Sequence, residues 1–392
     1  MSRHRNPPPV TLPMPAATPR GHRSHLAGAL AVTVLLSAAA VVPFALPRSV
    51  PAQATQAPVR AVGVGYRICP VADCAHYPRP AEIRGIALSS LENWLLFTRS
   101  AEAQIRAVST PGHPRHKSWH GNAIRLQLLQ DKLVGPKGNL WSPGYYRAIQ
   151  AIIAYALHRR LAVIVNAQSE PATGFPENEQ GPTVATYAFW RHFTRSYGHN
   201  PRVVFDLFNE PRCEPHNAGY SSAVCNWRAW WHAMWPLARY VRSIGSENQL
   251  WLEGNRWGSQ LGGVPLIPCH QAVAWCQGIV YSFHKPGCPW PNKCAATARV
   301  WWNQFGYLAA AGVPVVNGEM TNYRGGYYWS HSTQTMGKYL GFLHQYRIGV
   351  VAWSLQPGIM TATSSLTSAV SEPQGAGRLF WRYFHHEPLP GH

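Results

Sequence analysis

Three glutamates in this sequence end short apolar runs, and two of them could work as an acid–base pair. Glu210 follows the strand-forming run 203–208 and precedes Pro211, Glu253 ends "QLWLE", and Glu319 ends "PVVNGE". Only 16 residues of the chain are acidic, so three carboxylates in this kind of position are informative. A protonated carboxyl group can donate to a leaving oxygen while a second, ionised carboxylate attacks or activates water. That chemistry requires surroundings that push the two pKa values apart.

The elements that must position these glutamates follow from the alternation of strand-like and helix-like segments after about residue 83. Proline cannot donate to a strand ladder, so the strand before Glu210 is expected to end at Pro211. Strands are expected at 83–89, 122–128, 161–167, 202–208, 249–254, 278–284, 314–319 and 349–355, and helices at 144–160, 183–198, 226–245 (interrupted by Pro236), 298–312, 335–347 and 378–384.

Eight short strands separated mostly by helices predict an α/β fold of the (β/α)8 TIM-barrel class, a single domain over residues 81–386. A doubly wound open sheet is the competing architecture. It usually has fewer strands and often a glycine-rich phosphate turn after the first strand, which this sequence lacks.

The carboxyl ends of barrel strands meet at one face, where active sites of this fold lie. Strands four and seven lie across the barrel mouth from each other, so Glu210 and Glu319 are expected to converge to about 5 Å, as retaining cleavage of a glycosidic bond requires. Arg125, within strand two, would keep the attacking carboxylate ionised. The other polar or aromatic side chains expected at strand ends are Asn166, Gln168, Asn209, Glu253, Asn255, Tyr281, His284 and Trp353.

The segments "FDLFNEP" (205–211) and "PVVNGEM" (314–320) resemble the two signatures of glycoside hydrolase family 5, the cellulase family. The resemblance spans about residues 80–385. It implies a retaining mechanism with Glu210 as the acid/base and Glu319 as the nucleophile. It also implies that Asn209 bonds the sugar 2-hydroxyl.

The same resemblance assigns three further residues. "NAIRL" places Arg125 near the nucleophile, "VYSFH" places His284 at the position of an active-site histidine, and "VVAWSL" places Trp353 as the platform under the sugar. The aromatic face suits the apolar C–H face of a pyranose ring.

Two departures from the family pattern concern specificity. A histidine often ends strand three, where this chain has Asn166-Ala167-Gln168, and a tyrosine that orients the nucleophile often stands where this chain has Pro286. Gln168 is expected to contact the ligand, and Tyr281 or Tyr323 could replace the missing tyrosine. The predicted site therefore comprises catalytic Glu210 and Glu319 and substrate-binding Arg125, Asn209, Gln168, Tyr281, His284 and Trp353, with no metal and no cofactor.

Two further acidic residues have a structural interpretation beside the functional one. Glu253 could be a structural charge satisfied by Arg256 or Arg125, or it could contact sugar. Asp206 shares a strand face with Glu210 and is expected to be a polar member of the barrel wall.

The first 54 residues predict export. A basic arm without acidic residues precedes the apolar run 26–46, and Ala52-Gln53-Ala54 resembles a cleavage site. This pattern is typical of a signal peptide, while the run is also long enough to remain as a membrane anchor. Residues 55–80 are expected to be a linker or N-terminal extension. Either outcome places the protein outside the cytoplasm, secreted, periplasmic or anchored.

The eight cysteines agree with export. They form four close pairs whose local pairing as disulfides is the simplest connectivity. No Cys-x-x-Cys pair or cysteine–histidine cluster has zinc-ligand spacing. The pairs are Cys69/Cys74, Cys213/Cys225, Cys269/Cys276 and Cys288/Cys294.

The net charge of +19 suggests anionic partners, but the arginines are dispersed and no basic run or RNA-binding signature occurs. We therefore expect no nucleic-acid partner. The sequence predicts a monomeric, exported, retaining hydrolase of a β-linked polysaccharide, similar to endo-β-glucanases. The alternatives are a glycan-binding barrel without activity and a β-mannanase or exo-glucanase of the same family.

Overall fold

The computed structural model describes residues 82–88, 97–109, 118–135, 139–140, 142–168, 181–211, 226–265, 278–284, 297–321, 333–355, 360, 373 and 376–390. All of them belong to one compact unit, Ala54–His392. The predicted signal segment, the linker, Tyr323 and all eight cysteines lie outside the described residues. None of the helices in these ranges is long and apolar enough to cross a membrane.

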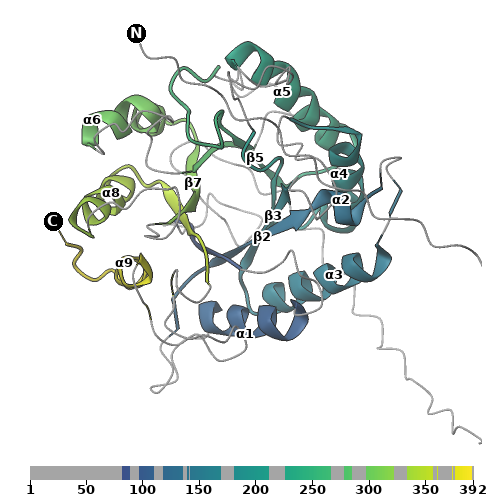
Figure 1. The fold of residues 1–392 in the computed structure, drawn as a ribbon, viewed down its shortest axis with the longest axis horizontal. Helices are drawn as coiled ribbons and strands as arrows, with labels where there is room; N and C mark the ends of the chain where they lie inside the picture. The colour runs from purple at the N-terminus through teal and green to yellow at the C-terminus, as the bar shows by residue number, and fades with distance from the viewer. Residues whose placement is uncertain are drawn as a thin grey trace, which may run out of the picture. The chain divides into compact units, whose positions relative to one another are not determined.

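Eight parallel strands form a closed barrel in the order β1 to β8, which confirms the predicted (β/α)8 fold. The strands lie in the middle of Figure 1 and the helices lie outside them. Their bounds are β1 Arg84–Ala87, β2 Ala123–Leu129, β3 Ala162–Gln168, β4 Val203–Asp206, β5 Gln249–Glu253, β6 Ile279–His284, β7 Val315–Met320 and β8 Gly349–Ala352.

The strands are buried on both faces, and alternate residues belong to two separate clusters. In β6, Tyr281 and Phe283 belong to the large cluster between sheet and helices. Val280 belongs to a smaller cluster inside the barrel. Because side chains alternate along a strand, His284 shares the inner face with Val280. The same alternation in β2 places Arg125 on the inner face with Ala123.

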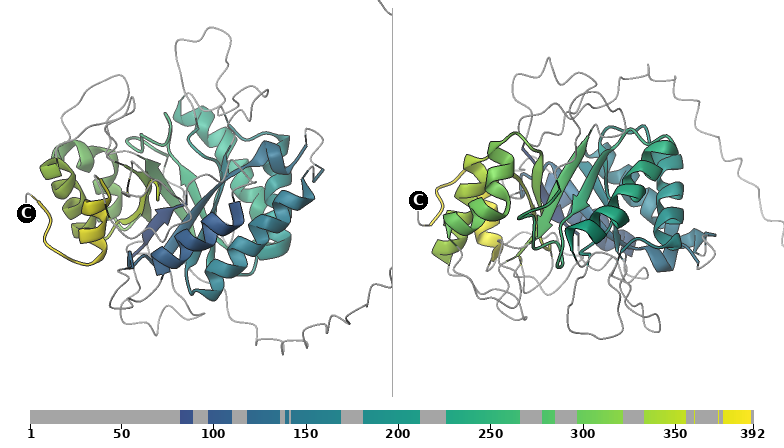
Figure 2. Two further views of the ribbon diagram at one scale, coloured as in Figure 1. Left: turned by 60° about the horizontal axis from the view of Figure 1, so that its bottom comes forward. Right: turned by 90° about the horizontal axis from the view of Figure 1, so that it is seen from above.

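Helices pack around the barrel, as the two turned views in Figure 2 show. Helix α4 begins at a capping box in which Thr183 and Thr186 bond each other's backbone amides. At the start of α5, the Asn226 side chain accepts a hydrogen bond from the Ala229 amide. The bounds are α1 Phe97–Ser109, α2 Gln130–Leu133, α3 Pro143–His158, α4 Val184–Tyr197, α5 Trp227–Ser243, α6 Ala298–Trp301, the π-helical turn η4 Trp302–Gly306, α7 Tyr307–Ala310, α8 Thr333–Gln345 and α9 Ala376–Phe384.

Three details differ from the sequence-based expectation. Helix α1 was not among the predicted helices. The helix expected at 298–312 contains the π-helical turn η4. The interruption expected at Pro236 does not occur, because α5 is continuous through it. Pro236 lies on an exposed position, where water can bond the helix carbonyl that proline leaves unpaired.

Candidate active site

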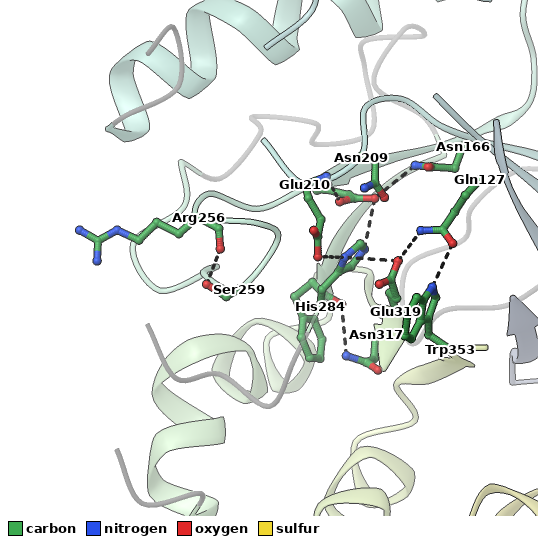
Figure 3. A network of polar contacts seen from close by, with 12 residues as sticks. Gln127, Asn166, Asn209, Glu210, Arg256, Ser259, His284, Asn317, Glu319 and Trp353 are labelled. Carbon is green, nitrogen blue, oxygen red and sulfur yellow. Dashed lines mark hydrogen bonds and ion pairs between the residues drawn. The ribbon is translucent and has the colours of Figure 1, made fainter. Parts of the chain in front are cut away.

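Glu210 and Glu319 converge at the carboxyl ends of β4 and β7. One ligand atom each from Glu210, Glu319 and His284 all lie within 4.8 Å of one another. The two glutamate side chains are 19% and 17% exposed, so both can be reached from solvent. The separation fits the geometry in which one carboxylate attacks a sugar while the other protonates the leaving oxygen. Figure 3 shows the two side chains directed toward each other, with His284 beside them.

Arg125 holds the interior of the site together from β2. Its guanidinium is fully buried and donates to three carboxylates on three other strands. Nε lies 2.9 Å from Asp206 Oδ2, Nη2 lies 3.0 Å from Glu253 Oε1, and Nη1 lies 2.7 Å from Glu319 Oε2. Burying so many charges is tolerable only because they are paired. Arg125 therefore fixes β4, β5 and β7 relative to β2.

Glu253 anchors the backbone of the acid/base candidate. Its Oε2 accepts the Glu210 amide N–H at 2.6 Å, while Asn166 Nδ2 approaches Oε1 at 3.4 Å. Glu210 has φ +43°, a left-handed conformation that is uncommon for a residue with a side chain. The bond to Glu253 compensates for that conformation, so the turn after β4 is held by β5.

His284, at the end of β6, lies between two carboxylates. Its Nδ1 is 3.0 Å from Glu210 Oε1 and its Nε2 is 3.2 Å from Glu253 Oε1. Glu319 Oε2 is 3.8 Å from the same Nδ1. Burial alone would lower the pKa of His284, but Glu253 and Glu319 raise it to about 10. The imidazole is therefore a cation at neutral pH and is shared between the acid/base candidate and the buried anchor.

The carboxyl groups of the site respond differently to the same surroundings. Burial and the charge of Glu253 raise the pKa of Asp206 well above its ordinary value. Burial also raises the pKa of Glu253, but His284 and Arg125 outweigh it and the net shift is downward. For Glu319, burial raises the pKa and exceeds the opposing effect of His284 and Arg125.

The carboxylates in turn raise the pKa of Arg125, although its burial acts in the other direction. Its charge is therefore permanent. One fixed cation and one imidazolium face four carboxyl groups, so the site favours states in which some of those groups are protonated. For Glu319 this differs from the sequence-based expectation that Arg125 keeps the carboxylate ionised, because burial outweighs the effect of Arg125 on its pKa.

Asn209 and Trp353 are placed by contacts within the site. Arg125 Nη2 donates to Asn209 Oδ1 at 2.8 Å, which fixes the orientation of the Asn209 amide. Trp353 Nε1 donates to Gln127 Oε1 at 3.1 Å, and Gln127 Nε2 donates to Glu319 Oε2 at 2.8 Å. Gln127 thus joins Trp353 to the candidate nucleophile Glu319.

Among the predicted substrate-binding residues, Tyr281 lies on the outer strand face and Gln168 on the inner one. Tyr281 faces the helices, its ring packs near Trp230, and its hydroxyl donates to the Pro265 carbonyl at 2.7 Å. It belongs to the core around the barrel and does not replace the missing tyrosine. Gln168 ends β3 on the same strand face as Asn166, in the barrel interior, and is 5% exposed.

The structure settles two open alternatives for the acidic residues. Glu253 pairs with Arg125, whereas Arg256 is directed away from the cluster in Figure 3. Asp206 is a buried member of the barrel wall, as expected. The sequence reasoning missed Gln127. Two-residue alternation places it on the same face as Arg125, and that signal could have identified it.

Comparisons with known proteins identify the family of this chain. The model of "Cellulase (glycosyl hydrolase family 5)" matches residues 104–358, more than half of the chain. A relative called manganese dependent endoglucanase Eg5A, from Phanerodontia chrysosporium, is 25% identical over 111 residues, 27% of this chain and 26% of that protein. The match therefore spans about a quarter of that relative's length.

Solved cellulase structures share the fold. The catalytic domain of alkaline cellulase K has a TM-score of 0.58 at 18% identity, with 79% of this chain and 90% of that chain covered. A hyperthermophilic endocellulase from the archaeon Pyrococcus horikoshii has a TM-score of 0.58 at 16% identity, with 82% and 99% covered. With the family model matching most of the barrel and these strands enclosing paired glutamates, the chain belongs to glycosyl hydrolase family 5 and is a glycosyl hydrolase.

Proposed function

We propose that this protein is an exported, retaining hydrolase that cleaves internal bonds of a β-linked polysaccharide, as endo-β-glucanases do. The observation behind the proposal is the convergence of Glu210 and Glu319 within 4.8 Å, with Arg125 held against Glu319 Oε2. The names of the similar proteins, endoglucanase and endocellulase, support a glucan as the substrate.

In the proposed first step, Glu319 attacks the anomeric carbon while Glu210 protonates the oxygen of the departing sugar. Arg125 Nη1 and Gln127 Nε2 both donate to Glu319 Oε2, so the other oxygen, Oε1, forms the bond to the sugar. Asn209 would bond the 2-hydroxyl, and Trp353 would support the ring from below.

In the proposed second step, Glu210 is ionised and accepts a proton from the incoming water molecule. The water oxygen bonds to the anomeric carbon, and the bond from the sugar to Glu319 breaks. Configuration is retained because the carbon is inverted twice. All protons in this cycle move between Glu210, the leaving sugar and water, and the cycle returns both glutamates to their starting states.

A direct test compares wild type, Glu210→Gln, Glu319→Gln and the exposed control Glu247→Gln on soluble β-glucans, β-mannans and aryl β-glycosides. We expect both site variants to lose about 10²–10⁴-fold or more in kcat, with the control unchanged. NMR of the first-formed sugar should show the β-anomer. Equal activity of all four proteins would reject the assignment of the two glutamates.

The same panel separates the alternatives. A glycan-binding barrel would retain polysaccharide without releasing reducing ends, even in wild type. A β-mannanase would prefer mannan, and an exo-acting enzyme would release one small product from the start without a rapid fall in viscosity. The geometry of two partly exposed carboxylates favours turnover over binding alone.

Export is proposed on the basis of the basic N-terminal arm, the apolar run 26–46 and the even number of cysteines. The test is N-terminal sequencing of protein recovered from the medium, where a start just after Ala54 is expected. A chain found only in membranes with an intact N-terminus would favour the anchor instead.

A further inference from the structure

Gln127 stands where the attacking glutamate needs a second hydrogen-bond donor. It belongs to β2 (Ala123–Leu129), two residues beyond Arg125, so both side chains point into the barrel with Gln127 nearer the carboxyl ends. Its side chain is almost fully buried, at 7% exposure. The carboxamide nitrogen lies 2.8 Å from Glu319 Oε2, the same oxygen that Arg125 Nη1 approaches at 2.7 Å.

The orientation of the Gln127 amide is determined by its two neighbours. The indole N–H of Trp353 can only donate, so the atom that faces it at 3.1 Å must be the carboxamide oxygen. The amide nitrogen is then turned to Glu319, whose oxygen can accept. A flipped amide would place its nitrogen against the Trp353 N–H and its oxygen against Glu319 Oε2. Neither pair of atoms could then form a hydrogen bond. Trp353 thus fixes Gln127 as a donor to Glu319.

Arg125 alone would leave the Glu319 carboxylate able to rotate about one contact. Arg125 and Gln127 stand two residues apart on β2, and both donate to the same oxygen of Glu319. Together these two hydrogen bonds fix the plane of the carboxylate. Correct placement of a reacting atom is worth large factors in rate, and small displacements lose them. The position where the family resemblance leads one to expect an orienting tyrosine is Pro286, which has neither hydroxyl nor amide hydrogen to donate.

We propose that Gln127 is the positioning residue for the nucleophile of this enzyme, replacing that tyrosine, and that Trp353 acts through it. Gln127 selects Oε1 of Glu319 as the attacking oxygen by occupying Oε2 together with Arg125. Because Trp353 is also the expected sugar platform, Gln127 links the surface on which the sugar rests to the atom that attacks it. This inference rests on the proposed function of Glu319.

The central experiment measures kcat and KM across pH for Gln127→Leu and Gln127→Glu, with Gln345→Leu on the exposed end of α8 as control. Leu removes the donor at similar volume, so kcat should fall about 10- to 100-fold, the range expected for a hydrogen bond to a charged group, with KM little changed. Thermal unfolding of each variant confirms that it is folded.

The pH profile distinguishes positioning from general loosening of the barrel. The charged groups that face Glu319 are Arg125, His284, Glu210 and Glu253, and none of them is altered in these variants. Loss of a donor disfavours the ionised form of Glu319, so the acid limb of kcat/KM should move to higher pH in Gln127→Leu. It should move further in Gln127→Glu, where a like charge replaces the donor.

A double-mutant cycle tests the part of Trp353. Trp353→Phe keeps an aromatic ring but removes the N–H that orients Gln127. It should lower kcat in the wild-type background and have a smaller effect in Gln127→Leu, because the orienting contact is already lost. Additive effects would remove Trp353 from the proposal.

The outcomes separate this inference from the proposed function. An inactive wild type, with Gln345→Leu equally inactive on every substrate, would reject the hydrolase itself. A wild type that is active while Gln127→Leu keeps the same kcat and acid limb would reject only the role of Gln127. Slower labelling of Glu319 by an activated 2-fluoro-glycoside in Gln127→Leu, with none in Glu319→Gln, would support it.

Discussion

His284 connects the partly exposed Glu210 to the buried Glu253. Its ring lies 3.0 Å from Glu210 and 3.2 Å from Glu253, and it is 1% exposed. A buried cation between two carboxylates stabilises the folded state only while it is charged. The stability of the barrel should therefore depend on pH through this ring.

The sign follows from the pKa of about 10 for His284 in the folded protein, compared with an ordinary value of 6.5. The stabilisation is complete below pH 6.5 and is lost as the pH rises toward 10, because the unfolded chain releases its proton first. Urea unfolding at intervals across this range should show declining stability in wild type and a flatter dependence in His284→Gln. Parallel curves for the two proteins would contradict the prediction.

Glu210, His284 and Glu319 could also hold a metal ion, and the name of one relative contains manganese. The proposed chemistry needs Glu319 free to attack and already gives its charge two donors. We expect dialysis against a chelator to leave kcat unchanged, with thermal stability measured in parallel to exclude an effect on folding. Loss of activity that Mn²⁺ alone restores would assign a metal to these side chains.

At the level of elements, Gly318 precedes the candidate nucleophile Glu319 on β7, where that strand lies close to β6. A Cβ at Gly318 would clash with Ser282 Oγ of β6, so the Ser282 side chain or the strand would have to shift. Gly318→Ala should destabilise the fold by about 1–3 kcal/mol and lower kcat by roughly 10²-fold, since Glu319 is displaced. Urea unfolding and initial rates measure the two effects.

Gly144, near the start of α3, is the matched control, because a Cβ there meets nothing within 4 Å. Gly144→Ala should keep full activity and equal or slightly greater stability. If Gly318→Ala matched it in both measurements, the close approach of β6 and β7 would not constrain the nucleophile.

The sequence predicted most of these elements but not all of them. Strands buried on both faces, such as β3, have continuous apolar runs that are easily recognised. Helix α1 was missed, and its sequence, FTRSAEAQIRAVS, mixes charged and apolar residues with a weak start signal. The π-helical turn η4 was also missed, and it ends at Gly306, where a Cβ would lie 2.8 Å from Phe342.

The candidate site was predictable in its reactive groups and less so in their partners. Glu210 and Glu319 stand at strand ends, where the fold rule places chemistry. That rule does not predict the partners of the reactive groups, as Gln127 and Tyr281 show. The role of Gln127 depends on which amide atom faces Trp353, and Tyr281 has the right position along β6 but the outer strand face.

On the scale of the whole molecule, the last helix packs where the two ends of the barrel meet. β1 pairs with both β2 and β8, and α9 packs beside them, with Tyr383 Oη bonded to Glu82 Oε1 at 2.8 Å. Phe380 in α9 is fully buried. The C-terminal helix therefore belongs to the core that holds the two ends of the barrel together.

Phe380→Ala should cost about 3–5 kcal/mol of unfolding free energy, because a large buried ring is removed without replacement. Val184→Ala, at a position 67% exposed, should be close to neutral. Chemical denaturation of both variants measures the difference. A small effect of Phe380→Ala would show that this ring contributes little to the core beside β1 and β8.

The bond from the Glu210 amide to Glu253 has a consequence for how this enzyme could be altered. Glu253 bonds the backbone amide at position 210, so this contact does not need the glutamate side chain that stands there. Shortening that side chain would leave a small vacancy beside the sugar on an unchanged frame. A small anion such as azide could enter it, accept the glycosyl group from Glu319, and convert a degrading enzyme into one that makes glycosyl azides.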